Sequence, residues 1–101
     1  MMNTIMPTYE QDDRFKHDLE RLTADEKRRF YAAVKKMVHD LKEGQRFRKS
    51  LRVKGLQSQR DVFEMTWADD GRALFKYGTS PHEGDVHIIW LRVGSHEIFD
   101  E

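Results

Sequence analysis

Residues 92–99 place reactive side chains of different types within one short corner of the chain. A strand-like run is followed there by the pattern Arg-x-Gly-Ser-His-x-x-Phe, whose functional members are Arg92, His96 and Phe99. An imidazole can take up or release a proton near neutral pH, and a guanidinium binds anions such as phosphate. Gly94 lets the backbone turn at the end of the strand. The pattern therefore predicts a site of proton transfer beside an anion-binding arginine.

Each of these side chains also has a purely structural interpretation. A histidine after a Gly-Ser turn is often a solvated loop residue. Arg92 shares a strand face with Trp90 and Ile88, and an arginine on an apolar face can extend its charged end to the solvent. Phe99 can pack onto the sheet. The residues of the corner leave both interpretations open.

The charge of the chain is divided unevenly along its length. The net charge is zero, with 18 basic and 18 acidic residues. Residues 42–60 nevertheless hold seven Lys or Arg against one Glu, whereas residues 61–101 hold three against nine acids. The basic side chains of the middle segment include Arg46, Arg48, Lys49, Arg52, Lys54 and Arg60. They can bind phosphates or an acidic partner, or they can simply solvate a loop. Neutrality of the whole chain argues against a dedicated nucleic-acid binder.

Length and composition limit the class of protein. The 101 residues contain no internal repeat and fit one domain over 1–101. The absence of cysteine excludes disulfides and thiolate metal sites. The first residues form neither a charged leader nor the apolar stretch of a secretion signal. No run reaches the roughly 20 apolar residues that a membrane helix needs. We therefore expect a cytoplasmic protein with no membrane partner.

Two amphipathic helices are predicted in the first half of the chain. Apolar residues recur at helical spacing over about residues 10–22, which predicts the first helix. Thr23 and Glu26 have the form of a capping box, and the apolar repeat that follows predicts a second helix over about 24–43. Because about one residue joins the two helices, we expect them to fold back on each other as a hairpin.

The second half of the chain is predicted to form the sheet. Two runs rich in aromatic and β-branched residues, 62–67 and 72–77, are joined by an Ala-Asp-Asp-Gly turn. A third run follows at 86–93, and short strands at 51–53 and 4–6 are possible additions. These elements predict an α+β fold with two layers, in which the N-terminal helical hairpin packs on an antiparallel sheet of three to four strands.

The orientation of Arg72 depends on the hairpin loop before it. An even number of loop residues puts Arg72 on the strand face of Trp67 and Met65. An odd number, or a bulge, puts it on the face of Glu64 and Thr66. A role for Arg72 in the site requires the face that also holds the histidine, and the sequence leaves this question open.

Taken in order, these features resemble the RelE/ParE superfamily of bacterial toxins. The likeness covers about residues 12–99. It rests on two helices, a Lys-Gly-Leu segment at 54–56, a strand that begins Gly-Arg-Ala-Leu-Phe at 71–75, and the strand that ends in Arg-x-Gly-Ser-His. It is strongest for the RelE/YafQ-like branch, in which an aromatic residue follows the histidine shortly. The resemblance implies a small sheet packed on a helical hairpin.

The resemblance also implies an activity and a partner. Members like RelE and YafQ cleave messenger RNA in the ribosome without a metal or other cofactor, and a partner antitoxin wraps and silences them. The chain is therefore expected to be a type II toxin, an endoribonuclease that inhibits translation, held in a hetero-oligomer with its antitoxin or as a homodimer. Two alternatives stay open: a ParE-like toxin that poisons gyrase by protein contact, and a non-catalytic binding protein of the same fold.

Position by position, the resemblance assigns roles to five residues. His96 is similar to the family's proton-transfer histidine, Arg92 to its phosphate-binding arginine, and Phe99 to the aromatic residue that holds a base. Arg72 is similar to the arginine at the start of the family's central strand. Asp70 resembles the acid that YafQ-like members carry just before that strand.

Cleavage of RNA by its own 2'-hydroxyl needs three chemical functions. These are a base for the hydroxyl proton, cations for the extra negative charge on phosphorus, and an acid for the leaving 5'-oxygen. His96 can act as the base, and the two arginines named above can supply positive charge. Lys54 or a nearby arginine can steady or protonate the leaving group. Arg48 and Arg52 of the basic segment are expected to bind substrate.

The chain departs from the family at several positions. Glu64 and Thr66 stand where RelE-like members carry lysines. Lys54 and Trp67 stand where YafQ-like members carry further histidines. Phe99 lies one residue closer to the histidine than the corresponding residue of YafQ. These exchanges bear on the catalytic rate.

Overall fold

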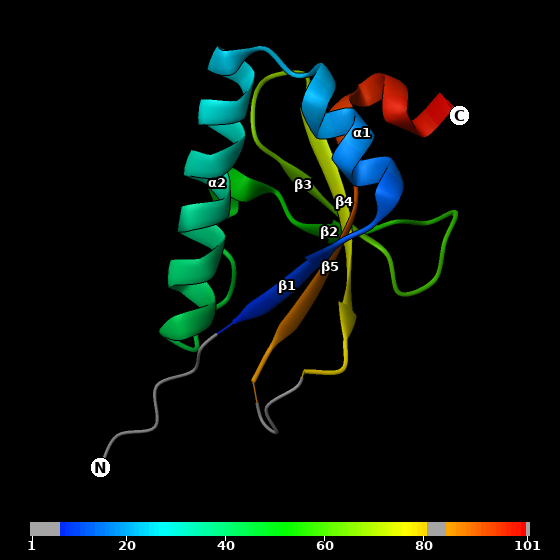
Figure 1. Ribbon diagram of the computed structural model, residues 1–101. Coiled ribbons are helices and arrows are strands. Elements are labelled where there is room, and N and C mark those ends of the chain that lie inside the picture. Colours follow the sequence, from blue (N-terminus) through cyan, green and yellow to red (C-terminus); the bar gives the residue numbers. More distant parts are fainter. Residues whose placement is uncertain (1–6, 81–84, 101) are drawn as a thin grey trace.

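The computed structural model describes residues 7–80 and 85–100. Its elements are β1 (Thr8–Gln11), α1 (Asp13–Arg21), α2 (Ala24–Lys42), the 3-10 helix η1 (Lys49–Leu51), β2 (Lys54–Gly55), β3 (Phe63–Thr66), β4 (Gly71–Gly78), β5 (His87–Ser95) and the 3-10 helix η2 (His96–Asp100). One sheet, in the order β1-β5-β4-β3-β2, carries both α-helices on one side (Figure 1). The predicted α+β architecture is confirmed. Among the described residues, no helix is long and apolar enough to span a membrane.

The edge of the sheet differs from the prediction. β1 runs parallel to β5, with Thr8 opposite His87 and Gln11 opposite Trp90, whereas the other strand pairs are antiparallel. The sheet therefore has five strands in the described part of the chain, not three to four, and it is mixed. A parallel pair needs a long crossover connection, and the helices with β2 to β4 provide it. The strand predicted at residues 4–6 lies outside the described residues.

β1 also displaces the predicted start of the first helix. Glu10, expected to be helical, lies in β1, and α1 begins at Asp13. Asp12 is the residue that separates the two elements. Its N–H donates to the carbonyl of Trp90 at 2.9 Å, and its carboxylate accepts from the N–H of Arg14 at 3.4 Å. A capping aspartate three residues after the β-prone Thr-Tyr pair is the local signal for this boundary.

α2 agrees with the prediction to one residue. It spans Ala24–Lys42 and starts with a complete capping box. Thr23 Oγ1 accepts from the N–H of Glu26 at 3.1 Å, and Glu26 Oε1 accepts from the N–H of Thr23 at 2.8 Å. Loss of such an N-cap typically costs about 1 kcal/mol. The two helices diverge from their junction (Figure 1), so each packs on the sheet instead of along the other, which corrects the predicted hairpin.

The main core lies between the helices and the sheet. Its aromatic centre joins Phe15 of α1, Phe30 of α2 and Trp90 of β5. The ring centroids are 5.9 Å apart for Phe15 and Phe30, and 5.4 Å apart for Phe30 and Trp90. Burying each large apolar side chain contributes about 1.5–3 kcal/mol. We call the other side of the sheet, which faces away from α1 and α2, the outer face.

A smaller apolar cluster covers part of the outer face. Val62, Leu74 and Ile98 are buried there. Ile98 belongs to η2, and a Cβ atom at Gly94 would lie 2.9 Å from its Cγ2 atom. A glycine therefore lets η2 pack this close to β5. The packing fixes the turn after β5, and with it His96, the first residue of η2.

The basic segment, residues 42–60, includes β2, the edge strand opposite β1. Residues 51–53 were expected to extend as a strand, but η1 forms there and Arg52 adopts left-handed backbone with φ of 48°. Leu51 is buried in the main core and anchors η1. β2 then places Lys54 opposite Glu64 of β3. The segment is therefore part of the folded surface and not a free loop.

Candidate functional site

His96 and Asp70 lie side by side at the end of the β4–β5 ladder. β4 begins at Gly71, which is opposite Ser95, the last residue of β5. The residues just outside this ladder therefore meet, and Nδ1 of His96 contacts Oδ1 of Asp70. Both side chains are largely exposed, His96 at 62% and Asp70 at 63%. We call them the histidine–aspartate pair.

The carboxylate of this pair sets the position of the imidazole proton. An ionised carboxylate only accepts hydrogen bonds, so Nδ1 of neutral His96 carries the proton and Nε2 keeps its lone pair. Nε2 is then the atom that can take a proton from a substrate. The turn that carries it is held by the N–H of Glu97, which donates to Ser95 Oγ at 3.2 Å. Within residues 7–80 and 85–100, no three His, Cys, Asp or Glu side chains gather so that they could hold a metal ion.

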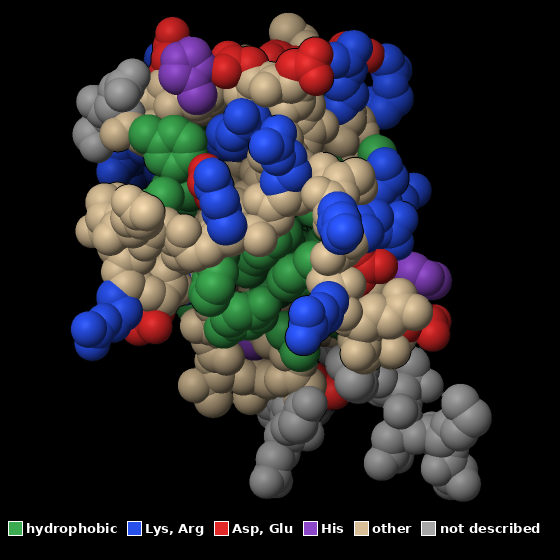
Figure 2. Space-filling model, turned by 180° about the vertical axis from the view of Figure 1, so that it is seen from behind, with side chains coloured by type: hydrophobic (Ala, Val, Ile, Leu, Met, Phe, Trp, Pro, Cys, Tyr) green, Lys and Arg blue, Asp and Glu red, His purple; other side chains and the backbone are tan. Residues whose placement is uncertain are grey.

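A basic cleft of about 510 Å³ opens between η1, the end of β3 and the start of β4. It is lined by Phe47, Arg48, Lys49, Arg52, Val53, Lys54, Glu64, Thr66 and Arg72. Four basic residues predicted to belong to the site line the cleft together: Arg48, Arg52, Lys54 and Arg72. Lys49 is a fifth basic residue in its lining. Figure 2, which views the molecule from behind, shows Lys and Arg side chains spread over the middle of the surface, with acidic side chains along its upper edge and at its sides. His96 is not one of the lining residues.

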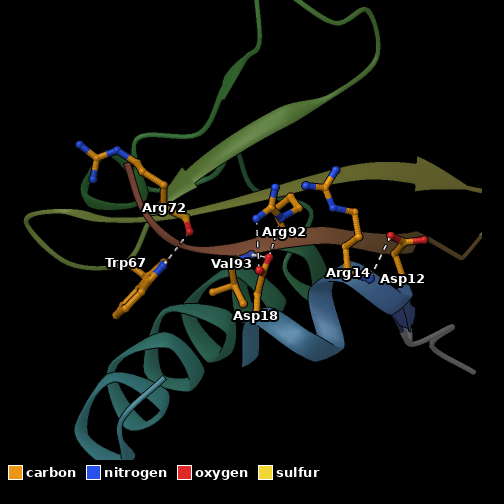
Figure 3. Close-up of polar contacts among 7 residues, drawn as sticks. All are labelled: Asp12, Arg14, Asp18, Trp67, Arg72, Arg92 and Val93. Atoms are coloured by element: carbon orange, nitrogen blue, oxygen red, sulfur yellow. Dashed lines mark hydrogen bonds and ion pairs between the residues drawn. The ribbon is translucent and has the colours of Figure 1, made fainter. Parts of the chain in front are cut away.

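Arg72 lines the cleft and lies two residues after Asp70 of the histidine–aspartate pair. It stands in β4 between Thr66 of β3 and Gly94 of β5, so its side chain lies on the outer face. Because Thr66 pairs with Arg72, the loop between these two residues has an odd number of residues. This answers the question about the orientation of Arg72 that the sequence left open. Its Nη1 donates to the carbonyl of Gly71 at 2.9 Å and to two further carbonyls of the turn. Figure 3 shows it pointing away from Trp67, whose Nε1 donates to the Arg72 carbonyl at 3.0 Å.

Arg92 forms an ion pair with a carboxylate of α1. Its Nε and Nη2 donate to Asp18 of α1 at 2.6 and 3.2 Å, and the residue is 8% exposed. Asp18 Oδ2 also accepts from the N–H of Val93 at 3.1 Å (Figure 3). β1 ends opposite Trp90, so Asp18 replaces the strand neighbour that Val93 lacks on that side. The structure makes Arg92 half of a part-buried ion pair, and its role in binding phosphate stays a prediction.

A second hollow, of about 470 Å³, adjoins the basic cleft. It is lined by Lys54, Gly55, Leu56, Gln57, Ser58, Glu64 and Phe99. Lys54 and Glu64 line both hollows, and the Lys54 Nζ to Glu64 Oε1 distance is 3.2 Å. Phe99 is 39% exposed, so the aromatic residue predicted to bind substrate is accessible in this second hollow. We call it the Phe99 hollow.

Arg48 is held at the rim of the cleft by a buried carboxylate. Asp40 of α2, 3% exposed, accepts from Arg48 Nη2 at 2.8 Å, from Nε at 3.1 Å and from the backbone N–H at 2.9 Å. The hydrogen bonds from Arg48 lower the pKa of Asp40 from 3.8 to about 2. The same carboxylate raises the pKa of Arg48. Arg48 therefore anchors the basic segment to α2 as well as adding charge to the cleft.

Asp18 and Asp40, the partners of two predicted site arginines, were not predicted from the sequence. Asp18 follows the buried Phe15 by three residues, and Asp40 follows the buried Met37 by three. Each therefore points to the packed side of its helix. An acidic residue three positions after a buried apolar residue of a helix is the sequence signal that could have predicted these two ion pairs. A carboxylate on the packed side of a helix needs a basic partner.

Comparison with known proteins identifies the fold of this chain. No protein-family model matches the chain, and no curated protein matches its sequence. Solved structures do match. A chain of the Escherichia coli DinJ-YafQ toxin-antitoxin complex superposes with a TM-score of 0.66 at 11% identity, over 98% of this chain and 100% of that one. The chain has the RelE/YafQ-like toxin fold.

Two further structures agree with this fold assignment. A copper-bound mutant toxin from Helicobacter pylori has a TM-score of 0.64 at 17% identity, over 92% of this chain and 98% of that one. The RelBE2 toxin-antitoxin complex from Mycobacterium tuberculosis has a chain with a TM-score of 0.50 at 22% identity, over 87% of this chain and 95% of that one. The resemblance seen in the sequence is thus confirmed for the fold. In this RelE/YafQ-like fold, the roles of single residues rest on the geometry described above.

Proposed function

We propose that this RelE/YafQ-like protein is the toxin of a type II toxin-antitoxin pair, and that it cleaves messenger RNA on the ribosome in the cytoplasm without a metal ion. The observation that carries the proposal is the position of the histidine–aspartate pair. Asp70 lies two residues before Arg72, and His96 lies two residues after Gly94, the partner of Arg72 in β5. The base therefore stands just beyond the end of the β4–β5 ladder. Arg72, the first outward side chain of β4, lines the basic cleft.

The reaction begins with the 2'-hydroxyl of the nucleotide before the cleaved bond. Nε2 of His96 takes its proton, and the 2'-oxygen attacks the neighbouring phosphorus. Asp70 acts as a positioning residue, since it holds the imidazole in the tautomer that leaves Nε2 unprotonated. The charge that develops on the phosphorane oxygens is stabilised by the guanidinium of Arg72, with Arg52 and Lys54 further along the cleft.

The reaction ends when the bond between phosphorus and the 5'-oxygen breaks. The leaving oxygen takes the proton of the imidazolium formed in the first step, either directly or through Lys54, which gives up a proton and regains one from the imidazolium. Both paths return the histidine to its base form. The products are a 2',3'-cyclic phosphate and a 5'-hydroxyl. Every proton is accounted for by side chains of this protein. Arg48 and Lys49 bind phosphates along the strand on either side of the cleaved bond.

The partner proposed for this toxin is a cognate antitoxin. Two of the matching structures, DinJ-YafQ and RelBE2, are toxin-antitoxin complexes, which supports a partner of this kind. The exposed basic surface around the cleft fits an acidic segment of such a partner. The negative charges of that segment would neutralise the basic side chains, as the phosphates of RNA would. An antitoxin that covers the cleft would block catalysis and RNA binding together.

Induced expression in a bacterial host tests the proposal. The parent protein is expected to arrest growth and to deplete full-length messages, and His96→Ala is expected to lose both effects at equal protein level. Growth arrest by His96→Ala that equals the parent would contradict the catalytic proposal and would favour a toxin that acts by contact, such as a gyrase poison. Absence of arrest by the parent would contradict the toxin proposal as a whole.

A further inference from the structure

The Phe99 hollow has the composition of a pocket for one RNA base. It combines an accessible aromatic ring with the charged pair of Lys54 and Glu64 and with the polar side chains of Gln57 and Ser58. Bases of single-stranded RNA are bound by stacking on aromatic rings and by hydrogen bonds to their Watson–Crick edges. Lys54 and Glu64 also line the basic cleft, so a strand whose phosphates lie there can turn one base into this hollow.

Glu64 is the residue that the proposed cleavage does not use. It is 9% exposed and therefore buried in the wall between the two hollows, where a phosphate-binding surface has no need of a negative charge. It lies opposite Lys54 in the β2–β3 ladder, so the two side chains share one face of the sheet. Lys54 Nζ stands 3.2 Å from Oε1 of Glu64. The wall thus presents an ammonium donor beside a carboxylate, whose two oxygens both accept hydrogen bonds.

Guanine has the complementary edge. Its O6 accepts, and its N1–H and N2–H₂ groups donate, in that order along the Watson–Crick edge. Adenine and uracil each match two of the three positions on the protein, and neither has two neighbouring donors for both oxygens of a carboxylate. Cytosine has one donor beside two acceptors and leaves one carboxylate oxygen without a partner. A carboxylate that engages both of its oxygens therefore selects guanine.

We propose that Glu64 and Lys54, with Phe99 stacked on the ring, form a guanine-binding subsite next to the cleavage site. Glu64 is then a specificity-determining residue, and it explains why an acid occupies a wall of an otherwise basic cleft. This inference rests on the proposed function, because it assumes that the cleft binds RNA.

Binding of short RNAs in the absence of cleavage tests the subsite. Six-nucleotide uridine RNAs with a single guanine, inosine or adenine at one central position are titrated calorimetrically into the His96→Ala protein. Guanine is expected to bind about tenfold tighter than adenine, as one bidentate pair typically provides. Inosine, which lacks the N2 amino group, is expected to fall between the two. This comparison of three RNAs needs no change in the pocket.

Glu64→Gln, combined with His96→Ala, then assigns the preference to the carboxylate. The guanine and adenine RNAs are expected to bind this variant within about twofold of each other. Glu97→Gln, which removes an exposed acid nearby in η2, is the matched control for charge and is expected to keep the tenfold preference. Circular dichroism confirms that each variant is folded.

The outcomes separate the inference from the proposed function. Equal binding of all three RNAs by the His96→Ala protein overturns the guanine subsite but leaves the RNA-cleaving cleft in place. A guanine preference that survives Glu64→Gln also overturns it, since another group must then recognise the base. Failure of every RNA to bind, together with intact message in the growth assay, overturns both proposals.

Discussion

The imidazole of His96 contacts the carboxylate of Asp70, and this contact joins the end of β5 to the turn before β4 across 26 residues of sequence. Neither residue is buried, so the contact adds little to stability. Its consequence is chemical: the carboxylate determines which ring nitrogen of neutral His96 carries the proton, and the other nitrogen is the base of the proposed reaction.

Asp70→Asn is expected to lower the rate of RNA cleavage about 10- to 100-fold, less than the loss known for a buried aspartate in this role because both side chains are exposed here. The amide can donate to Nδ1 and so favours the tautomer with the proton on Nε2. Nitrogen NMR shifts of the His96 ring measure this directly. A purely structural role for Asp70 would leave the tautomer unchanged, and the same tautomer in both proteins would refute the positioning role.

Arg52→Ala is expected to weaken RNA binding equally for all sequences, because Arg52 lines the cleft and is proposed to bind phosphate. The slope of log affinity against log salt concentration should fall by about 0.7, the value for one phosphate contact to a single strand. Arg60→Ala is the control, since Arg60 lies in the same basic segment but does not line the cleft. An equal change of slope in both variants would mean that the cleft has no special part in binding.

Asp18→Asn is expected to destabilise the fold by about 3 kcal/mol, because it leaves the buried guanidinium of Arg92 without its countercharge. Glu20→Gln, an exposed change on the same helix, should stay within about 0.5 kcal/mol of the parent. Chemical denaturation measures both. If Asp18→Asn abolished RNA cleavage while leaving the free energy of unfolding intact, Arg92 would belong to the site and not to the core.

The ion pair of Asp40 and Arg48 makes stability depend on pH in the acid range. The pKa of Asp40 is lowered from 3.8 to about 2 by the hydrogen bonds from Arg48. A lowered pKa means that the stabilisation is fully present above about 4 and is lost as the pH falls through about 2. Asp40→Asn is expected to be less stable at neutral pH and to show a shallower loss of stability between these values. Thermal melts over pH 2–6 measure it, and parallel pH profiles for parent and variant would contradict the assignment.

Sequence patterns correctly predicted the helices and strands that are specified by residues close together in the chain. The capping box of Thr23 and Glu26 with the repeat behind it located α2, and the Ala-Asp-Asp-Gly turn located the β3–β4 hairpin. β1 was not predicted, because its identity depends on a parallel pairing of Thr8 with His87, far away in the sequence. No periodicity within four residues can indicate such a partner.

The site followed the same division between local and distant signals. His96 was named from a short motif and Asp70 from the family resemblance, and the ladder between β4 and β5 brings them together. Arg92 was assigned by its likeness to the family's phosphate-binding arginine. In the structure the β4–β5 register shifts between Leu74 and Phe75 of β4, and Asp18 of α1 pairs with the guanidinium of Arg92. A bulge and a partner from a distant helix are both invisible to a motif, so this ion pair was not predicted.

Cleavage of a defined message by purified protein in the presence of ribosomes tests the central claim most directly. Mapping both new ends identifies the chemistry. The account predicts 2',3'-cyclic phosphate and 5'-hydroxyl ends with the parent protein, and intact message with His96→Ala at the same concentration. Intact message with the parent, or equal cleavage by His96→Ala, would contradict it.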